Sequence, residues 1–269
     1  MRILFVGDVV AQAGRRVLKA GLRAIRKSHR PDLIIVNGEN SARGHGLTPQ
    51  CSDQIFSAGA DVITSGNHVW DRREVHALLE SDPRVLRPAN YPDPAPGSGV
   101  HLVEHPAEGP LAVVNLMGRL FMADIDDPFR AADEILGELE GRARLVLIDF
   151  HAEATSEKIA FGWHVDGRAT AVVGTHTHVA TADERVLPGG TAYITDVGMT
   201  GPYDSVIGVE KELALQRFLS YAPVRFRPAK RDNHLAAVII DIDESTGRAR
   251  GIRRLFLADD EDNNYPGKP

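Results

Sequence analysis

Two histidines separated by a single residue, His176 and His178, follow the apolar run Ala171–Val173 and the turn residue Gly174. Histidine is the commonest side-chain ligand of metal ions. A His-x-His pair on its own also fits an ordinary surface loop. The pair indicates a metal site only if other residues of ligand type come to the same place.

Polar residues that can bind metals follow four other short apolar runs. These stretches are Gly7-Asp8, Asn37-Gly38-Glu39-Asn40, Ser65-Gly66-Asn67-His68 and Asp149-Phe150-His151. Each has an ordinary explanation when taken alone, such as a turn residue, a helix cap or a hydrogen-bonded core histidine. If the apolar runs are strands, however, their carboxyl ends form the crevice where α/β proteins bind ligands. The five stretches together therefore predict one site.

The number of candidate ligands favours two metal ions over one. The candidates are Asp8, Glu39, Asn40, Asn67, His151, His176 and His178. They exceed the four ligands of a tetrahedral structural zinc, and the only cysteine, Cys51, follows none of these strand ends. In a pair of ions about 3.5–4 Å apart, one carboxylate can bridge and a water can be shared. We expect Glu39 to be the bridge.

The charge of such a site indicates its substrate. Two divalent ions bring four positive charges, while Asp8, Glu39 and a bridging hydroxide cancel three, which leaves a net charge of about +1. This charge suits an anionic phosphate group. The site would activate water and stabilise the negative charge that develops on phosphoryl oxygens, so it predicts phosphoester hydrolysis by the metal-bridging hydroxide.

The elements that must position these residues are short buried strands with helices between them, which predicts the α/β class. The last two strands are expected to form an antiparallel hairpin through Glu244–Gly247, so the sheets should be mixed. Expected strands are Ile3–Val6, Leu33–Val36, Val62–Thr64, Leu111–Asn115, Leu145–Phe150, Ala171–Val173, Tyr193–Thr195, Leu235–Ile242 and Gly251–Phe256. Expected helices are Gly14–His29, Thr48–Ser57, Arg72–Glu80, Pro128–Glu140 and Glu210–Ser220.

Composition restricts the class of protein further. A chain of 269 residues with 43% hydrophobic and 25% charged residues is typical of a soluble globular protein, and we expect one domain over residues 1–269. The net charge of −6 disfavours binding to duplex nucleic acid. No apolar run reaches the roughly 18 residues of a membrane span. A single cysteine allows no intrachain disulfide, so the cytoplasm is the expected compartment.

The motifs resemble those of the calcineurin-like metallophosphoesterases, and in particular the YmdB-like family. Gly7-Asp8, Gly66-Asn67-His68, His151 and the His176/His178 pair occur in the order of that superfamily's signature. Val10 stands where the superfamily has a histidine, and Gly38-Glu39-Asn40 replaces its second aspartate motif, as in the YmdB-like branch. The stretches that carry this resemblance are "GDVV", "NGENSARGHGLT", "SGNHVWD", "RPANYP", "NLMGR", "DFHAEATSEK" and "GWHVDGRATAVVGTHTHVATADERVLPGGTAYITDVGMTGPYDSVIG".

The resemblance implies a sandwich of two mixed β-sheets flanked by helices. One ion would be bound by Asp8, Glu39, Asn40 and His178, and the other by Glu39, Asn67, His151 and His176. Oxygen and imidazole ligands without sulfur suit Fe(II) or Mn(II), with Zn(II) as a further option. The resemblance also implies a homo-oligomer.

The implied reaction is hydrolysis of a small phosphodiester, a 2′,3′-cyclic nucleotide that opens to a 3′-nucleotide. His68 would be a catalytic side chain that binds a phosphoryl oxygen when neutral, or donates a proton to the departing ribose oxygen when protonated. Its ordinary alternative is a loop histidine that caps the helix expected near Asp71.

Other interpretations stay open at this point. The chain could be a regulatory protein that binds a nucleotide or another partner and merely retains the metal site. A Rossmann-type nucleotide binder is disfavoured because the G-x-G-x-x-G fingerprint is absent. Arg43 and His45 could contact the substrate or simply be solvated, and Arg15 and Arg16 are interpreted as charges on a helix surface. Thr155, Ser156 and Glu157 are interpreted as structural residues at a helix start.

Overall fold

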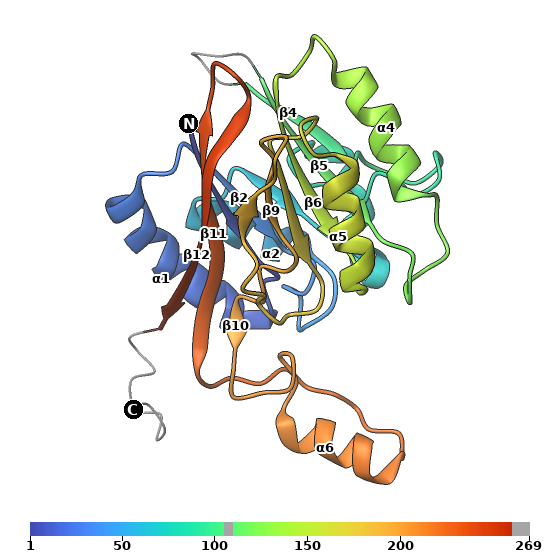
Figure 1. Ribbon diagram of the computed structural model, residues 1–269. Coiled ribbons are helices and arrows are strands. Elements are labelled where there is room, and N and C mark those ends of the chain that lie inside the picture. The colour runs from blue at the N-terminus through green and yellow to red at the C-terminus, as the bar shows by residue number, and fades with distance from the viewer. Residues whose placement is uncertain (105–109, 260–269) are drawn as a thin grey trace.

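The fold consists of two six-stranded mixed sheets with helices on their outer faces, as the computed structural model in Figure 1 shows. The structure describes residues 1–104 and 110–259. The first sheet has the order β10-β11-β1-β2-β3, with β12 paired to β11. The second sheet has the order β4-β5-β6-β7-β9-β8. The expected sandwich of two mixed sheets is confirmed.

The strands of the first sheet are β1 (Arg2–Val6), β2 (Leu33–Asn37), β3 (Val62–Thr64), β10 (Gly201–Pro202), β11 (Asn233–Asp243) and β12 (Arg248–Ala258). Those of the second are β4 (Val100–Val103), β5 (Leu111–Met117), β6 (Leu145–His151), β7 (Ala171–Thr175), β8 (Arg185–Val186) and β9 (Ala192–Ile194). The helices are α1 (Ala11–His29), α2 (Pro49–Ala58), α3 (Val75–Ser81), α4 (Pro128–Leu139), α5 (Thr155–His164) and α6 (Lys211–Ser220), with the 3-10 turn η1 (Val69–Asp71).

Both faces of the central strands are buried, which explains why they are continuous apolar runs in the sequence. In β1, Ile3 and Phe5 belong to the core between the two sheets, whereas Leu4 and Val6 pack under the helices α1 and α2. In β6, Leu147 faces the core between the sheets and Ile148 faces α4 and α5. Side chains alternate along each strand, so one strand contributes to two apolar layers.

Parallel pairing places the functional strand ends together. In the first sheet β1, β2 and β3 are parallel neighbours, and in the second sheet β5, β6, β7 and β9 are parallel. The expected antiparallel hairpin is formed by β11 and β12. Each parallel set therefore presents its carboxyl ends at one edge.

The expected elements are confirmed, with some boundaries and short elements corrected. The helix expected over Arg72–Glu80 begins only at Val75, because the chain first makes the turn η1. The strands β4, β8 and β10 were not expected, since four or fewer residues carry little periodic signal. The structural interpretation of Thr155–Glu157 is confirmed in that α5 starts at Thr155, but no side chain caps this helix.

The segment that carries α6 projects away from the sheets (Figure 1). Several large apolar side chains of this segment are exposed: Leu215, Phe218, Leu219 and Tyr221. The expectation of a single domain stays a prediction. Among the described residues, no helix combines the length and apolar character needed to cross a membrane.

Gly174 provides a test of how tightly β7 packs. A Cβ atom at Gly174 would overlap the carbonyl oxygen of Thr195. A Cβ built on the helical Gly137 has no described atom within 4 Å apart from its chain neighbours and the adjacent helix backbone. We expect Gly174→Ala to lower the free energy of unfolding by about 1–3 kcal/mol through overpacking. Gly137→Ala should raise it by up to about 1 kcal/mol, because alanine has the higher helix propensity. Urea unfolding of both variants measures this, and equal stabilities would contradict the packing described.

Candidate metal centre

All seven candidate ligands meet where the carboxyl ends of the two sheets face each other. Asp8 follows β1, Glu39 and Asn40 follow β2, and Asn67 follows β3 in the first sheet. From the second sheet come His151, the last residue of β6, and the residues His176 and His178 after β7. Asp8, Glu39 and His151 are at most 1% exposed.

One group of ligand atoms comprises Glu39, His151 and His176, with one atom from each lying within 4.8 Å of the others. Glu39 Oε2 lies 3.2 Å from His151 Nε2, which in turn lies 3.1 Å from His176 Nδ1. Asn67 Oδ1 is 2.9 Å from the same Nε2 atom. These four residues are the set expected for one of the two ions.

A second group comprises Asp8, Glu39 and His178, again with one atom from each within 4.8 Å of the others. Asn40 Oδ1 lies 3.2 Å from His178 Nε2 and completes the set expected for the other ion. Glu39 belongs to both groups. A carboxylate shared in this way has the position required of a bridging ligand.

Each of the three histidines has one ring nitrogen bonded to an acceptor away from the ligand groups. The contacts are His151 Nδ1 with Thr175 Oγ1 at 2.8 Å, His176 Nε2 with Glu153 Oε2 at 3.0 Å, and His178 Nδ1 with the carbonyl oxygen of Ile207 at 2.8 Å. A carbonyl oxygen can only accept, so His178 donates to Ile207, while His176 Nε2 faces the Glu153 carboxylate. The other ring nitrogen of each of these histidines faces the ligand groups, as in metal sites.

A buried carboxylate orients His151 through Thr175. The Thr175 hydroxyl donates to Asp149 Oδ1 at 2.7 Å, so its oxygen is left to accept from His151 Nδ1. Asp149 also accepts from Thr64 Oγ1 at 2.5 Å and from Asn37 Nδ2 at 3.0 Å. Burial raises the pKa of Asp149 to about 6. In the sequence, the carboxylate of Asp149 inside the apolar run of β6 was the signal of this network, for which no role was predicted.

The residues fit a pair of divalent cations. Asp8 Oδ1 is buried and has no hydrogen-bond partner among the described residues. Buried acceptors normally have a partner, and a bound cation would be one for this oxygen. A Cβ atom at Gly66 would overlap both His151 Nε2 and Glu39 Oε2, so glycine keeps the space between these ligands open. The donor set contains only carboxylate, amide and imidazole atoms, which suits Fe(II), Mn(II) or Zn(II).

The pKa shifts show how strongly these groups interact. Burial raises the pKa of Glu39, but attraction to His151 outweighs burial and lowers it to about 2. Burial lowers the pKa of His151, yet the nearby Glu39 and Asp8 carboxylates raise it to about 9. Burial and the adjacent His151 lower the pKa of His176 to about 3, so His176 is neutral and its lone pair is available. Burial raises the pKa of Asp8.

The loop with His176 and His178 has a strained backbone. Both residues have positive φ, 103° and 66° respectively, which non-glycine residues rarely adopt. Asp196 holds the loop by accepting from the Thr177 amide at 3.1 Å and from its hydroxyl at 2.8 Å. The buried Lys158 ammonium donates to Asp196 Oδ2 and to the Thr175 carbonyl, both at 2.7 Å. Strain of this kind persists where surrounding contacts over-determine it.

His68 lies beside the ligand groups without belonging to them. Its backbone amide donates to Glu39 Oε2 at 3.3 Å, and its Nδ1 atom lies 2.9 Å from Asp71 Oδ2. The residue precedes η1, but its side chain makes no cap hydrogen bond to that turn. The His45 ring lies edge-on to the His68 ring, with centroids 4.7 Å apart. Asp71 is therefore a carboxylate partner of His68 that the sequence analysis did not identify.

The ligand groups open into a cavity of about 540 Å³. His68, Arg43 and His45 line this cavity together with Glu39 and His178. Val10, which stands in place of the superfamily's first histidine, also lines it, so this position offers no imidazole ligand. The cavity gives a small anionic molecule access to the candidate metal centre.

Two mixed sheets that meet at a cluster of carboxylate, amide and imidazole ligands define a protein of the metallophosphoesterase class. Comparison with protein families places the chain more specifically within this class. The family described as YmdB-like protein matches residues 4–255. The chain belongs to this family.

The similarity to known proteins covers nearly the whole chain. A Bacillus subtilis (strain 168) protein named 2′,3′-cyclic-nucleotide 2′-phosphodiesterase is 51% identical over 261 residues, which cover 97% of this chain and 98% of that protein. The crystal structure of a hypothetical protein from Thermus thermophilus superposes with a TM-score of 0.90 at 48% identity, covering 96% of this chain and 99% of that one. A structure described as a novel phosphatase from Mycoplasma pneumoniae has a TM-score of 0.91 at 33% identity, with coverage of 99% and 97%.

The bond from Thr177 to Asp196 can be tested as a support of the two histidines. Thr177→Val removes the hydroxyl, which donates to Asp196 and accepts from the Val179 amide at 3.3 Å. We expect about tenfold weaker Mn²⁺ binding, the lower end of the effect of losing a residue that orients ligands. Thr170→Val is the matched control, because it removes a buried hydroxyl that accepts from the Val146 amide at the other end of β7. Mn²⁺ titration of chelator-treated proteins measures the difference. Equal affinities in both variants would show that this bond does not position the ligands.

Proposed function

We propose that this chain is a metal-dependent phosphodiesterase that hydrolyses 2′,3′-cyclic nucleotides to 3′-nucleotides. The observation that carries the proposal is that Glu39 belongs to both groups of ligand atoms, as a ligand that bridges two ions would. The name of the Bacillus subtilis relative supports the cyclic-nucleotide substrate.

The proposed ligands divide as the family resemblance implies. Asp8, Glu39, Asn40 and His178 would hold one ion, and Glu39, Asn67, His151 and His176 the other. A bound pair of divalent ions supplies Lewis acidity toward phosphoryl oxygens and lowers the pKa of a water molecule that attacks phosphorus. Fe(II) or Mn(II) are the metals we propose, with Zn(II) as a further option.

A side chain of this protein, His68, would donate the proton that the leaving oxygen of the substrate needs. His68 Nδ1 lies 2.9 Å from Asp71 Oδ2, and a carboxylate can only accept, so the ring donates its Nδ1 proton there. When the His68 ring is protonated on both nitrogens, the proton on Nε2 is the one that can be transferred. This atom would donate to the 2′ oxygen as its bond to phosphorus breaks, while the Asp71 carboxylate stabilises the imidazolium. Asp71 is thus a positioning residue.

A homo-oligomer remains part of the proposal. The exposed apolar side chains of α6, among them Phe218 and Leu219, support it, because such side chains gain stability when a second surface covers them.

The first test is metal-dependent hydrolysis. The chelator-stripped protein should be inactive toward bis-p-nitrophenyl phosphate and 2′,3′-cyclic AMP, and Mn(II) or Fe(II) should restore both reactions. Glu39→Gln should abolish the restored activity, because both ions lose a charged ligand. Product analysis should give the 3′-monophosphate. A protein that binds two metals but hydrolyses neither compound would favour the regulatory alternative.

The second test separates a catalytic histidine from a ligand. His68→Ala should keep both metals and lose turnover by a factor of about 10²–10⁴, the range of a general acid. His178→Ala should lose metal. His164→Ala is the matched control, since His164, the last residue of α5, pairs with Asp133 of α4 at 3.0 Å and lines neither ligand group, and it should change neither property. Metal analysis and initial rates measure these effects. Full activity of His68→Ala would remove His68 from the mechanism.

A further inference from the structure

A second cavity, of about 570 Å³, adjoins the one that contains the candidate metal centre. The two cavities share Arg43, Arg227 and Pro228 in their linings. The second cavity lies between the beginning of α1 and the segment around residues 227–230. A ligand bound at the metal centre can therefore extend past Arg43 into this neighbouring space.

The lining of the second cavity is strongly basic, although the chain as a whole has a net charge of −6. Five cationic side chains line it against one carboxylate, Glu210: they are Arg15, Arg16, Arg43, Arg227 and Lys230. Such a local excess of positive charge attracts anions to the cavity.

Three of these cations are not balanced by a carboxylate. Arg43 and Lys230 make no ion pair within the described part of the chain, and Arg15 donates to neutral oxygens, the Gln54 side chain at 2.6 Å and the Ser41 carbonyl. By contrast, Arg227 pairs with Glu210 at 2.9 Å and Arg16 with Asp259 at 3.4 Å. Arg15, Arg43 and Lys230 thus keep their charge available to a ligand.

The first turn of α1 adds to this positive potential. Ala11, Gln12 and Ala13 line the cavity, and this turn contains no acidic residue and no side-chain cap. The N-terminal end of a long helix carries partial positive charge that favours anions. The helix dipole therefore has the same sign as the side chains that surround the cavity.

We propose that this basic cavity binds a second phosphate group of the substrate, attached to the 5′ oxygen of the nucleotide whose cyclic phosphate lies at the metal centre. This inference rests on the proposed function. Arginine is well suited to the role, because its guanidinium forms two parallel hydrogen bonds with phosphate oxygens. Arg43, which lines both cavities, links the two phosphate positions. Arg15, interpreted from the sequence as a surface charge, becomes a binding residue.

The second phosphate has two chemical sources, which different substrates distinguish. It is either a terminal 5′-phosphate on a cyclic mononucleotide or the internal phosphodiester of a short oligoribonucleotide that ends in a cyclic phosphate. The experiment compares kcat and KM of the Mn²⁺-loaded protein for three compounds: 2′,3′-cyclic AMP, its 5′-phosphorylated form, and an adenosine dinucleotide with a 2′,3′-cyclic end.

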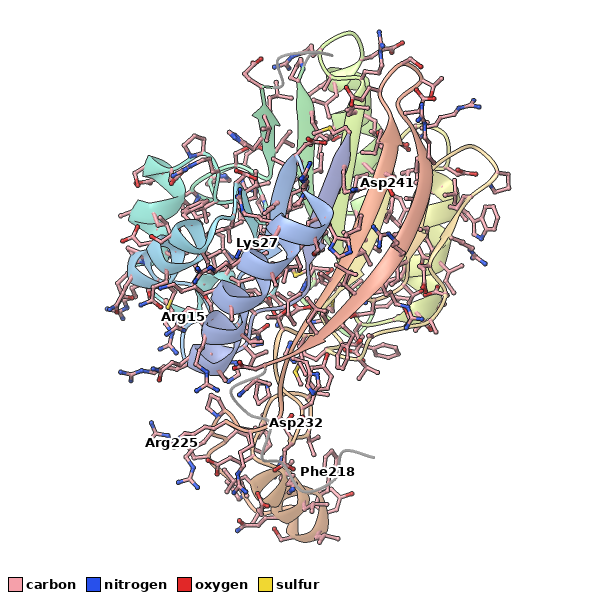
Figure 2. The ribbon with its side chains drawn as sticks, turned by 90° about the vertical axis from the view of Figure 1, so that its left-hand side faces the viewer. Arg15, Lys27, Phe218, Arg225, Asp232 and Asp241 are labelled. Atoms are coloured by element: carbon pink, nitrogen blue, oxygen red, sulfur yellow. The ribbon has the colours of Figure 1, made fainter. Side chains whose placement is uncertain are left out.

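We expect at least one compound with a second phosphate to have a KM about tenfold below that of 2′,3′-cyclic AMP, the factor provided by one charge-assisted hydrogen bond. The preference should decrease as ionic strength rises. Lys230→Ala should reduce the preference to near unity. Lys27→Ala is the matched control, because Lys27 lies nearer the other end of α1 than Arg15 does (Figure 2), and it should leave the preference unchanged.

The outcomes are separable. A preference for the dinucleotide alone identifies oligonucleotide ends as the substrate, and a preference for both compounds identifies a site for any 5′-phosphate. Hydrolysis of 2′,3′-cyclic AMP without any preference would overturn the second-phosphate site and leave the proposed function intact. A preference that survives in both Lys230→Ala and Arg15→Ala would overturn its assignment to this cavity. No hydrolysis of any compound would overturn the proposed function, and this inference with it.

Discussion

The contact between Glu39 and His151 joins the two sheets at the candidate metal centre. Glu39 follows a strand of the first sheet, His151 ends a strand of the second, and their side chains approach to 3.2 Å in a fully buried position. Buried charge is costly unless it is paired or binds metal. Asp8 is buried beside them, and one of its oxygens has no hydrogen-bond partner among the described residues. The packing of the sheets therefore produces a site that bound cations would stabilise.

The polar residues around the ligands form a buried network that orients them. Asp149 acts on His151 through the Thr175 hydroxyl, and Lys158 and Asp196 hold the loop that contains Thr177. Fully satisfied networks of this kind rigidify a site, whereas a partly satisfied network is unstable in a low-dielectric interior. The positive φ values of His176 and His178 are maintained by these surrounding contacts and not by local preference.

Charge is distributed unevenly over this acidic protein. The buried carboxylates at the candidate metal centre favour cations, while Arg15, Arg43 and Lys230 beside it favour anions. The two regions are complementary to two parts of one ligand. A substrate phosphate would meet divalent ions at one end, and further negative charge would meet side-chain cations at the other. Recognition of an anionic ligand by this protein depends on the local arrangement of cations, because the chain as a whole has a net negative charge.

The sequence by itself determined the α/β class, the main strands and the types of the candidate ligands, and it led to the prediction that Glu39 is the bridge. These features are local: apolar runs, turn residues and the polar residues directly after them. The tertiary structure decided the rest, because it depends on contacts across long stretches of chain, such as that from His176 to Asp8, 168 positions apart. Only the structure pairs His68 with Asp71, orients His178 through its bond to the Ile207 carbonyl, and places Arg15 in a cavity with Lys230. Spacing predicts which residues share a sheet edge, but orientation and hydrogen bonding arise only when the two sheets pack.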